Sequence, residues 1–180
     1  MNNRFIMTAF GKDRVGIVAD VTRLLYEYDC NLEDTTMNML SDEFTLNLLF
    51  SSKEDDLVEP LSRECRRLEL EKGISAFVRQ LPDSDHVKAN GFKDCTLHVE
   101  CLDQVGIVYK TSRFLAENNL NIVHLNSTSR FSPESGDKIH CMDIHIQIPE
   151  GRSLDQIEDD LGVMADELQV DISMSRQSEA

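Results

Sequence analysis

Long apolar runs and basic residues are both scarce in this 180-residue sequence. No segment approaches the roughly 20 apolar residues that a membrane-spanning helix requires. The N-terminus leads directly into a strand-like pattern without the form of a signal peptide. The net charge is −15, with −6 over residues 1–90 and −9 over residues 91–180. From the lack of an apolar run we expect no membrane insertion. Because an acidic surface repels phosphate backbones, we also expect no direct nucleic-acid binding.

The cysteines lack the spacing of a disulfide framework or a zinc site. There are five, an odd number, and no pair has the CxxC spacing. They fall at apolar positions of the expected helices and strands, which predicts buried free thiols in a reducing compartment and hence a cytoplasmic protein. The five are Cys30, Cys65, Cys95, Cys101 and Cys141.

Motifs for catalysis are absent as well. The sequence contains neither a G-x-S-x-G nucleophile elbow nor a phosphate-binding P-loop. The acidic runs Glu54-Asp55-Asp56 and Glu158-Asp159-Asp160 fall where we expect the first turns of helices, and negative charge there stabilises the helix dipole. We therefore expect a protein that is not an enzyme, with no catalytic residues and no cofactor.

An internal repeat dominates what the sequence does contain. Shifted by 90 residues, the segment DRVGIV at 13–18 lies over DQVGIV at 103–108, and further identities follow in register. Such contiguous matching indicates a duplication. We expect a first domain over residues 1–81, a linker over 82–93, a second domain over 94–175 and a tail over 176–180. The further identities are Arg23 with Arg113, Leu25 with Leu115, Glu27 with Glu117 and Asn31 with Asn121.

Each copy has the periodicities of strand, helix, two strands, helix and strand. Alternating apolar residues predict strands, and a stripe at helical spacing predicts a helix from Ile17. Asp29 and Asn119 lie where these helices should end in a left-handed residue, and Ser153-x-x-Gln156 predicts a helix cap. The order βαββαβ predicts an α+β fold of two ferredoxin-like modules, each an antiparallel sheet with helices on one face. The expected helix stripe is Ile17, Val18, Val21, Leu24, Leu25 and Tyr28, and the expected inward strand residues are Phe5, Met7, Ala9, Phe44, Leu46, Leu48 and Phe50.

The strand-to-helix turns, Gly11–Ile17 and Leu102–Ile107, are the candidate binding sites. The first N–H groups of a helix lack intrahelical partners and carry partial positive charge, which suits a carboxylate or another small anion. Gly16 and Gly106 would let a ligand approach the backbone closely. Alternatively, the two glycines serve only to pack the helix tightly on the sheet.

These stretches, DRVGIVADVTRLLYEYDCNL and DQVGIVYKTSRFLAENNLNI, resemble the ACT domain family. The resemblance covers nearly the whole chain except the linker and the tail. Tandem ACT domains of this length without an attached enzyme are similar to the glycine cleavage system transcriptional repressor family. Fold alone would not define the function.

The resemblance implies a small amino acid as ligand, bound where two modules meet. The turn of one module would supply backbone donors, and the asparagine of the other would hold the ligand across the interface. The family usually has proline where Val15 and Val105 stand, and the absence of proline makes these turns less rigid. The first copy has Arg14 where the second has Gln104, which suggests that the two sites are not equivalent. The implied ligand-binding residues are Asp13, Arg14, Val15, Gly16, Ile17 and Asn31 in the first copy and Asp103, Gln104, Val105, Gly106, Ile107 and Asn121 in the second.

Histidines and cysteines gather in the second copy. Strand alternation places Cys141, Asp143 and His145 on one face, where His98 could approach His145. A zinc site needs three or four converging ligands, and we expect solvated strand histidines and no metal site. The group is His98, Cys101, His124, His140, Cys141 and His145.

Three functions remain open from the sequence. The first is a regulator that senses a small amino acid, with glycine as the first candidate, and acts through a protein partner, including as a transcriptional co-regulator of amino-acid metabolism. The second is a freestanding regulatory subunit of an amino-acid-metabolising enzyme. The third is an interaction scaffold without ligand. In each case exposed strand edges favour a homodimer, with pairing of the two copies within one chain as the alternative.

Overall fold

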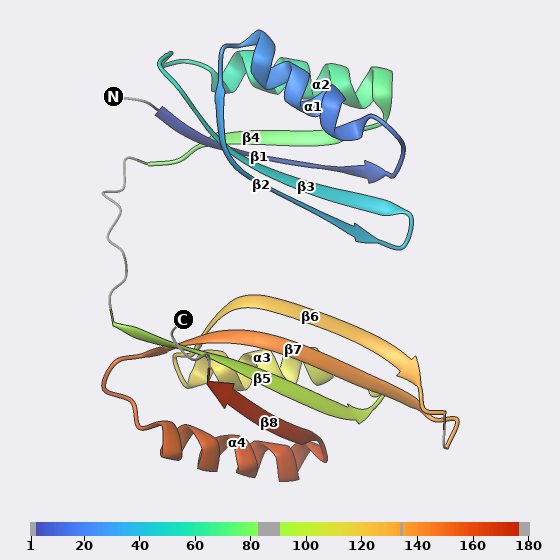
Figure 1. Ribbon diagram of the computed structural model, residues 1–180, viewed down its shortest axis with the longest axis vertical. Helices are drawn as coiled ribbons and strands as arrows, with labels where there is room; N and C mark the ends of the chain where they lie inside the picture. Colours follow the sequence, from blue (N-terminus) through green and yellow to red (C-terminus); the bar gives the residue numbers. More distant parts are fainter. Residues whose placement is uncertain (1–2, 83–90, 134, 177–180) are drawn as a thin grey trace. The chain divides into compact units, whose positions relative to one another are not determined.

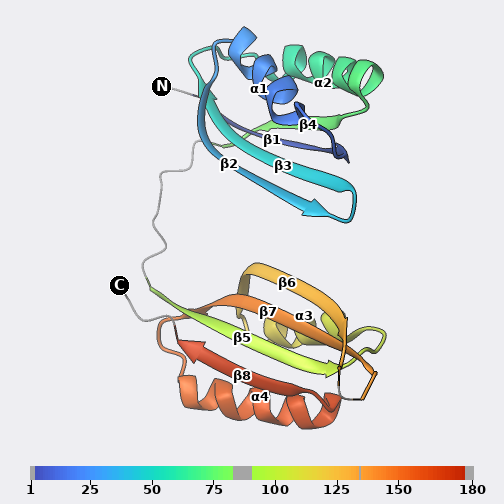
Figure 2. The same ribbon diagram turned by 45° about the vertical axis from the view of Figure 1, so that its right-hand side comes forward.

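The computed structural model describes residues 3–82, 91–133 and 135–176 of the chain (Figure 1). It divides into two compact units, Met1–Val87 and Lys88–Ala180. Each unit is a four-stranded antiparallel sheet with two helices on one face, as the two views in Figures 1 and 2 show. The prediction of an α+β fold built from two ferredoxin-like βαββαβ modules is confirmed.

The two modules have the same strand order. It is β2-β3-β1-β4 in the first and β6-β7-β5-β8 in the second. The elements of the first module are β1 (Asn3–Lys12), α1 (Ile17–Glu27), β2 (Asn31–Leu40), β3 (Glu43–Ser52), α2 (Val58–Lys72) and β4 (Ser75–Gln80). Those of the second are β5 (Phe92–Leu102), α3 (Ile107–Glu117), β6 (Asn121–Phe131), β7 (Lys138–Pro149), α4 (Leu154–Leu168) and β8 (Asp171–Arg176).

The core of the first module lies between its sheet and its helices. All seven inward strand residues expected from the alternation are fully buried or nearly so. Phe5 and Phe50 stack with ring centroids 5.5 Å apart. Of the expected helix stripe, Ile17, Val21, Leu24 and Leu25 are buried, whereas Val18 is 42% exposed. Val18 follows Ile17 by about 100° around the helix, so Ile17 reaches the core and Val18 does not.

The helix ends follow the sequence signals in part. Asp29 (φ 50°) and Asn119 (φ 56°) adopt the expected left-handed conformation, and the Ser153 side chain accepts the Gln156 N–H at the start of α4. The expectation for the two acidic runs was wrong. Residues 54–56 precede α2, which begins at Val58, and residues 158–160 lie in the second turn of α4, where the dipole contributes little.

Phe92 and Lys93 belong to β5, although the sequence pattern assigned both to the linker. They pair with Pro149 and Ile148 of β7. The ladder extends to them because backbone pairing does not depend on the polarity of the side chains. The rest of the expected linker, apart from Pro82 and Gly91, lies outside the described residues, as does most of the expected tail.

Edge strand β2 is uncovered on both faces. All ten of its residues are exposed, because the helices cover the other strands. Its outer edge pairs with no strand of the first module. Exposed apolar side chains on it are Leu32, Met37, Met39 and Leu40.

The cysteines are free thiols, as the sequence predicted. Cys65, Cys95 and Cys101 are buried, whereas Cys30 and Cys141 are only partly buried. Desolvation by burial raises the pKa of Cys65 to about 11, so this thiol resists ionisation. Among the described residues, no helix is long and apolar enough to cross a bilayer.

Candidate functional site

The two strand-to-helix turns have the same backbone geometry. Gly16 (φ 92°) and Gly106 (φ 86°) each precede a helix in the left-handed conformation. A Cβ atom added to Gly106 would meet nothing within 4 Å, and one added to Gly16 would meet only the Arg14 side chain at 3.9 Å. The alternative that these glycines serve tight packing is therefore wrong. Their conformation requires glycine, and the space above them is open.

Both turns leave the start of the following helix accessible. No side chain in the described part of the protein caps α1 or α3, so the first backbone N–H groups have no side-chain acceptor there. Val15 and Val105 are 98% and 100% exposed, whereas Ile17 and Ile107 are buried in the core. Each turn is thus anchored on one side and open to solvent on the other, where a small anion could reach the N–H groups.

The first turn carries an ion-pair network that the sequence pattern did not indicate. Arg14 Nη2 lies 2.6 Å from Asp20 Oδ2, and Lys72 Nζ lies 3.8 Å from Asp20 Oδ1. Arg14 also donates to the Val15 carbonyl at 3.2 Å. The hydrogen bond from Arg14 holds the pKa of Asp20 below its ordinary value. The 90-residue alignment places Lys110 opposite Asp20, a reversal of charge that could have drawn attention to this position.

Replacing Arg14 by glutamine is expected to raise the pKa of Asp20 toward its ordinary 3.8. In the wild type the lowered pKa means that the ion pair stabilises the fold at pH values above the unfolded-state pKa. This contribution is lost as the pH falls through the lower, folded-state value. An NMR titration of the Asp20 carboxyl carbon measures the shift of the pKa. The control is Arg113→Gln, which removes the Arg113–Glu117 ion pair on α3 and should leave the Asp20 titration unchanged. An unchanged Asp20 titration in Arg14→Gln would contradict the assignment.

The second turn is held by different partners. Gln104 Nε2 donates to the Leu168 carbonyl at 3.3 Å. Asp103 pairs with Lys138 at 2.7 Å and lies 3.7 Å from His140 Nδ1. The hydrogen bond from Lys138 lowers the pKa of Asp103. The two turns thus share a backbone but differ in their charges.

Asn31 and Asn121 lie at the end of their module that is opposite its strand-to-helix turn. The turn of the first module is tied to the β2–β3 hairpin by a hydrogen bond from Asp13 N to Asp42 O. Asn31 pairs with Ser51, which pairs with Arg4 at the start of β1. From Arg4 to Lys12 the strand rises about 26 Å at roughly 3.3 Å per residue. One module therefore does not bring its own turn and asparagine together, and a ligand that touches both needs a second module.

The surroundings of the two asparagines differ. Asn31 lines a hollow of about 230 Å³ together with Asp29, Ser51, Ser52, Lys53 and Glu54, and its amide makes no hydrogen bond among the described residues. Asn121 instead donates to Gln147 Oε1 at 3.4 Å. Of the lining residues, the sequence pattern indicated only Asn31 as a binding residue, because the others follow no recognisable motif.

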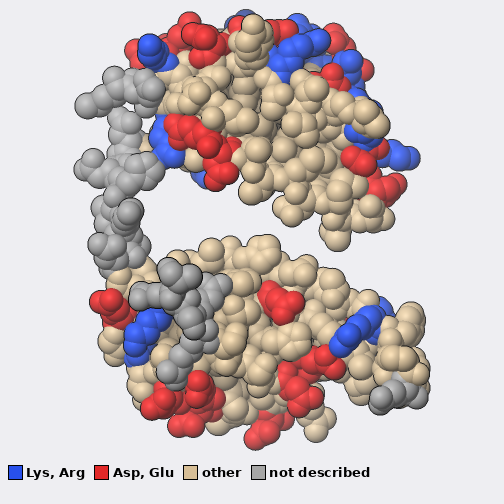
Figure 3. Space-filling view, in the orientation of Figure 1, with Lys and Arg blue, Asp and Glu red and all other residues tan. Residues whose placement is uncertain are grey.

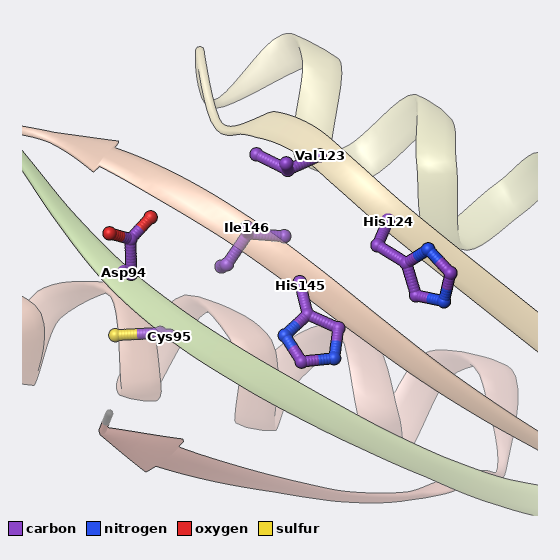
Figure 4. A pocket seen from close by; sticks show the side chains of 6 residues that line it. All are labelled: Asp94, Cys95, Val123, His124, His145 and Ile146. Carbon is purple, nitrogen blue, oxygen red and sulfur yellow. The ribbon is translucent and has the colours of Figure 1, made fainter. Parts of the chain in front are cut away.

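The histidines of the second module lie on its sheet and do not converge. Figure 4 shows the hollow of about 390 Å³ where His124 of β6 and His145 of β7 are neighbours, with ring centroids 5.6 Å apart. His145 Nδ1 lies 3.2 Å from Thr96 Oγ1. His98 pairs with Asp143 at 2.7 Å. In the described part of the chain, no three His, Cys, Asp or Glu side chains form a group that could hold a metal ion.

Comparison with known proteins identifies relatives of both modules. Residues 3–79 match the family model of the ACT domain. The glycine cleavage system transcriptional repressor of Escherichia coli (strain K12) is 30% identical over 150 residues, which cover 79% of this chain and 72% of that protein. A UPF0237 protein of Methanopyrus kandleri is 34% identical over 77 residues, which cover 42% of this chain and 86% of that protein.

Two crystal structures share the whole fold. An unknown protein from Galdieria sulphuraria has a TM-score of 0.81 at 24% identity, covering 99% of this chain and 100% of that one. A candidate glycine cleavage system transcriptional repressor has a TM-score of 0.74 at 22% identity, covering 99% of both chains. At these identities the likeness shows the fold alone. The chain belongs to the family of tandem ACT-domain proteins that includes the glycine cleavage system transcriptional repressor.

Proposed function

We propose that this protein is a non-enzymatic regulator that senses a small amino acid and transmits the signal through contact with another protein. The observation that carries the proposal is the pair of open, uncapped helix N-termini at Gly16 and Gly106. Both occur in a chain of the ACT-domain family. Exposed N–H groups beside a left-handed glycine suit the carboxylate of an amino acid.

The ligand would bind between two modules. Because the turn and the asparagine of one module lie a strand length apart, the turn of one module and the asparagine of another would share the ligand. The second module comes from the same chain or from a second copy. The free outer edges of β2 and β6 favour pairing of modules, and we propose a homodimer on this ground.

The affinity expected for such a site suits a sensor. A ligand such as glycine has five non-hydrogen atoms, and the best small ligands gain about 1.5 kcal/mol per atom. Binding is therefore limited to about −7.5 kcal/mol, which corresponds to a dissociation constant of a few micromolar. The site would respond to an amino-acid pool at micromolar to millimolar concentration.

A protein partner would carry the response. Helix α4 holds six acidic residues and no basic one, whereas α2 holds four of each. Figure 3 shows acidic side chains gathered at the α4 side of the second module. An acidic helix favours a partner with a basic surface. A transcription factor that co-purifies would support the co-regulator role, whereas an amino-acid-metabolising enzyme would support a regulatory subunit.

Isothermal titration with each proteinogenic amino acid tests the proposed function. We expect saturable binding of at least one small amino acid in the micromolar to millimolar range. Gly16→Leu and Gly106→Leu add a side chain beside the N–H groups and strain the left-handed turn. Both effects should weaken binding at least tenfold at whichever turn is used, and an unchanged melting temperature would exclude loss of the fold. The absence of heat or thermal shift with all amino acids at millimolar concentration would contradict amino-acid sensing.

A further inference from the structure

The hollow at Asn31 contains unpaired charges of both signs. Lys53, which follows the last residue of β3, lines it together with the carboxylates of Asp29 and Glu54. Among the described residues, none of these three side chains forms an ion pair or hydrogen bond. Surface charges of this protein otherwise pair frequently, as Arg4 does with Glu33 at 2.8 Å. Unpaired opposite charges around one small hollow are a feature that a zwitterion would complement.

The carboxylates of Asp29 and Glu54 both act on the thiol of Cys30. Besides desolvation by burial, which is the main cause, Glu54 and Asp29 raise the pKa of the neighbouring Cys30 thiol to about 11. Cys30 lies between Asp29 and Asn31 in the sequence, so both carboxylates act close to the start of β2. The backbone around Glu54 is fixed, because its N–H donates to Ser52 Oγ at 3.2 Å and its carbonyl accepts from Asn3. The loop that carries Lys53 and Glu54 is thus held in place before any ligand binds.

We propose that this hollow is the charge-recognition part of the amino-acid site, with Lys53 binding the ligand carboxylate and Asp29 and Glu54 binding its ammonium group. The inference rests on the proposed function and adds specificity-determining residues to it. A carboxylate offers about four acceptor positions, so the Lys53 ammonium can bind it together with the N–H groups of a turn from another module. The Asn31 amide is free to bind either end of the ligand.

The hollow is large enough for a small amino acid. Five heavy atoms occupy on the order of 150 Å³ if each takes the share of one liquid water molecule, about 30 Å³. The hollow measures about 230 Å³. Glycine fits, and room remains for a small side chain such as those of alanine or serine.

The second module lacks this arrangement. Gln147 of β7 pairs with β5 at the position where Ser51 of β3 pairs with β1. Two residues further along, Pro149 therefore stands where the first module has Lys53. The preceding residue, Ile148, is fully buried. The nearby cation, Arg152, already donates to Asn118 Oδ1 at 3.2 Å. Within residues 3–82, 91–133 and 135–176, the charge-recognition hollow therefore belongs to the first module.

Titration of an amino acid and its carboxamide tests the assignment of Lys53. The pair is glycine and glycinamide, or the tightest-binding amino acid and its amide. Glycinamide keeps the ammonium group and lacks the carboxylate, so the wild type should bind glycine at least tenfold more tightly. Lys53→Met keeps the length of the side chain and removes its charge. It should weaken glycine binding about tenfold, leave glycinamide binding unchanged, and so abolish the discrimination.

Arg152→Met in the second module is the matched control and should bind glycine as the wild type does. Lys53 is exposed, and an unchanged melting temperature of Lys53→Met would exclude misfolding. Wild-type binding that Lys53→Met leaves intact, or that Arg152→Met weakens equally, would overturn this inference and leave the proposed function standing. A wild type that binds no amino acid would overturn both.

Discussion

Replacing Phe50 by alanine is expected to lower the free energy of unfolding of the first module by about 3–5 kcal/mol. Phe50 is fully buried on β3 and stacks on Phe5 at 5.5 Å. The substitution removes this contact and leaves a cavity that the packed strands cannot close. Urea unfolding followed by circular dichroism measures the loss. Phe10→Ala, on the open face of neighbouring β1 and 45% exposed, is the control and should cost well under half as much.

The same variant tests whether the two units are independent. Because Phe50 belongs to the first core, hydrogen exchange should accelerate in the first module and stay unchanged in the second. Ile146→Ala, at the corresponding position of β7 and also buried, should show the converse. Equal acceleration in both modules of Phe50→Ala would mean that they unfold as one cooperative unit.

Gly11→Ala is expected to destabilise the first module by about 2–3 kcal/mol. A Cβ atom at Gly11 would lie 2.8 Å from the Gly73 carbonyl oxygen, which belongs to backbone and not to a flexible side chain. Gly11 also has φ 156°, a conformation that alanine rarely adopts, so the substitution adds backbone strain to the close contact. Thermal unfolding measures the effect.

Gly162→Ala provides a control of opposite sign. Gly162 lies within α4, and a Cβ atom added there meets nothing within 4 Å. Because alanine loses less backbone entropy than glycine in a helix, this variant should stabilise the second module by about 0.5–1 kcal/mol. A Gly11→Ala protein as stable as the wild type would show that the end of β1 moves away from Gly73 at little cost.

The sequence predicted the fold through two local signals. Alternation in strands and the helical stripe identified the core residues, because side-chain direction in these elements follows directly from position along the chain. Val18 shows the limit of this reasoning: its apolar character fits the stripe, but burial depends on which part of the helix surface meets the sheet. Phe92 and Lys93 show another limit, since backbone pairing with β7 extends beyond the apolar pattern.

The binding residues were predicted less completely. The left-handed conformation of Gly16 and Gly106 agrees with the reading of both turns as open helix N-termini. The Arg14–Asp20 pair could not be read from the sequence, because Asp20 faces Arg14 only once the helix is formed on the turn. The ligand-binding roles of all twelve residues, from Asp13 to Asn121, stay predictions until binding is measured.

The sequence by itself determined that the chain is a duplicated βαββαβ protein with two glycine turns of the same form, since repetition and periodicity are local properties of the chain. Tertiary structure decided which groups meet. Pairing of β2 with β3 brings Asn31 beside Lys53, 22 residues further along the chain, and it separates Asn31 from the turn of its own module. Such proximities depend on strand register and helix placement, which no short segment of sequence specifies.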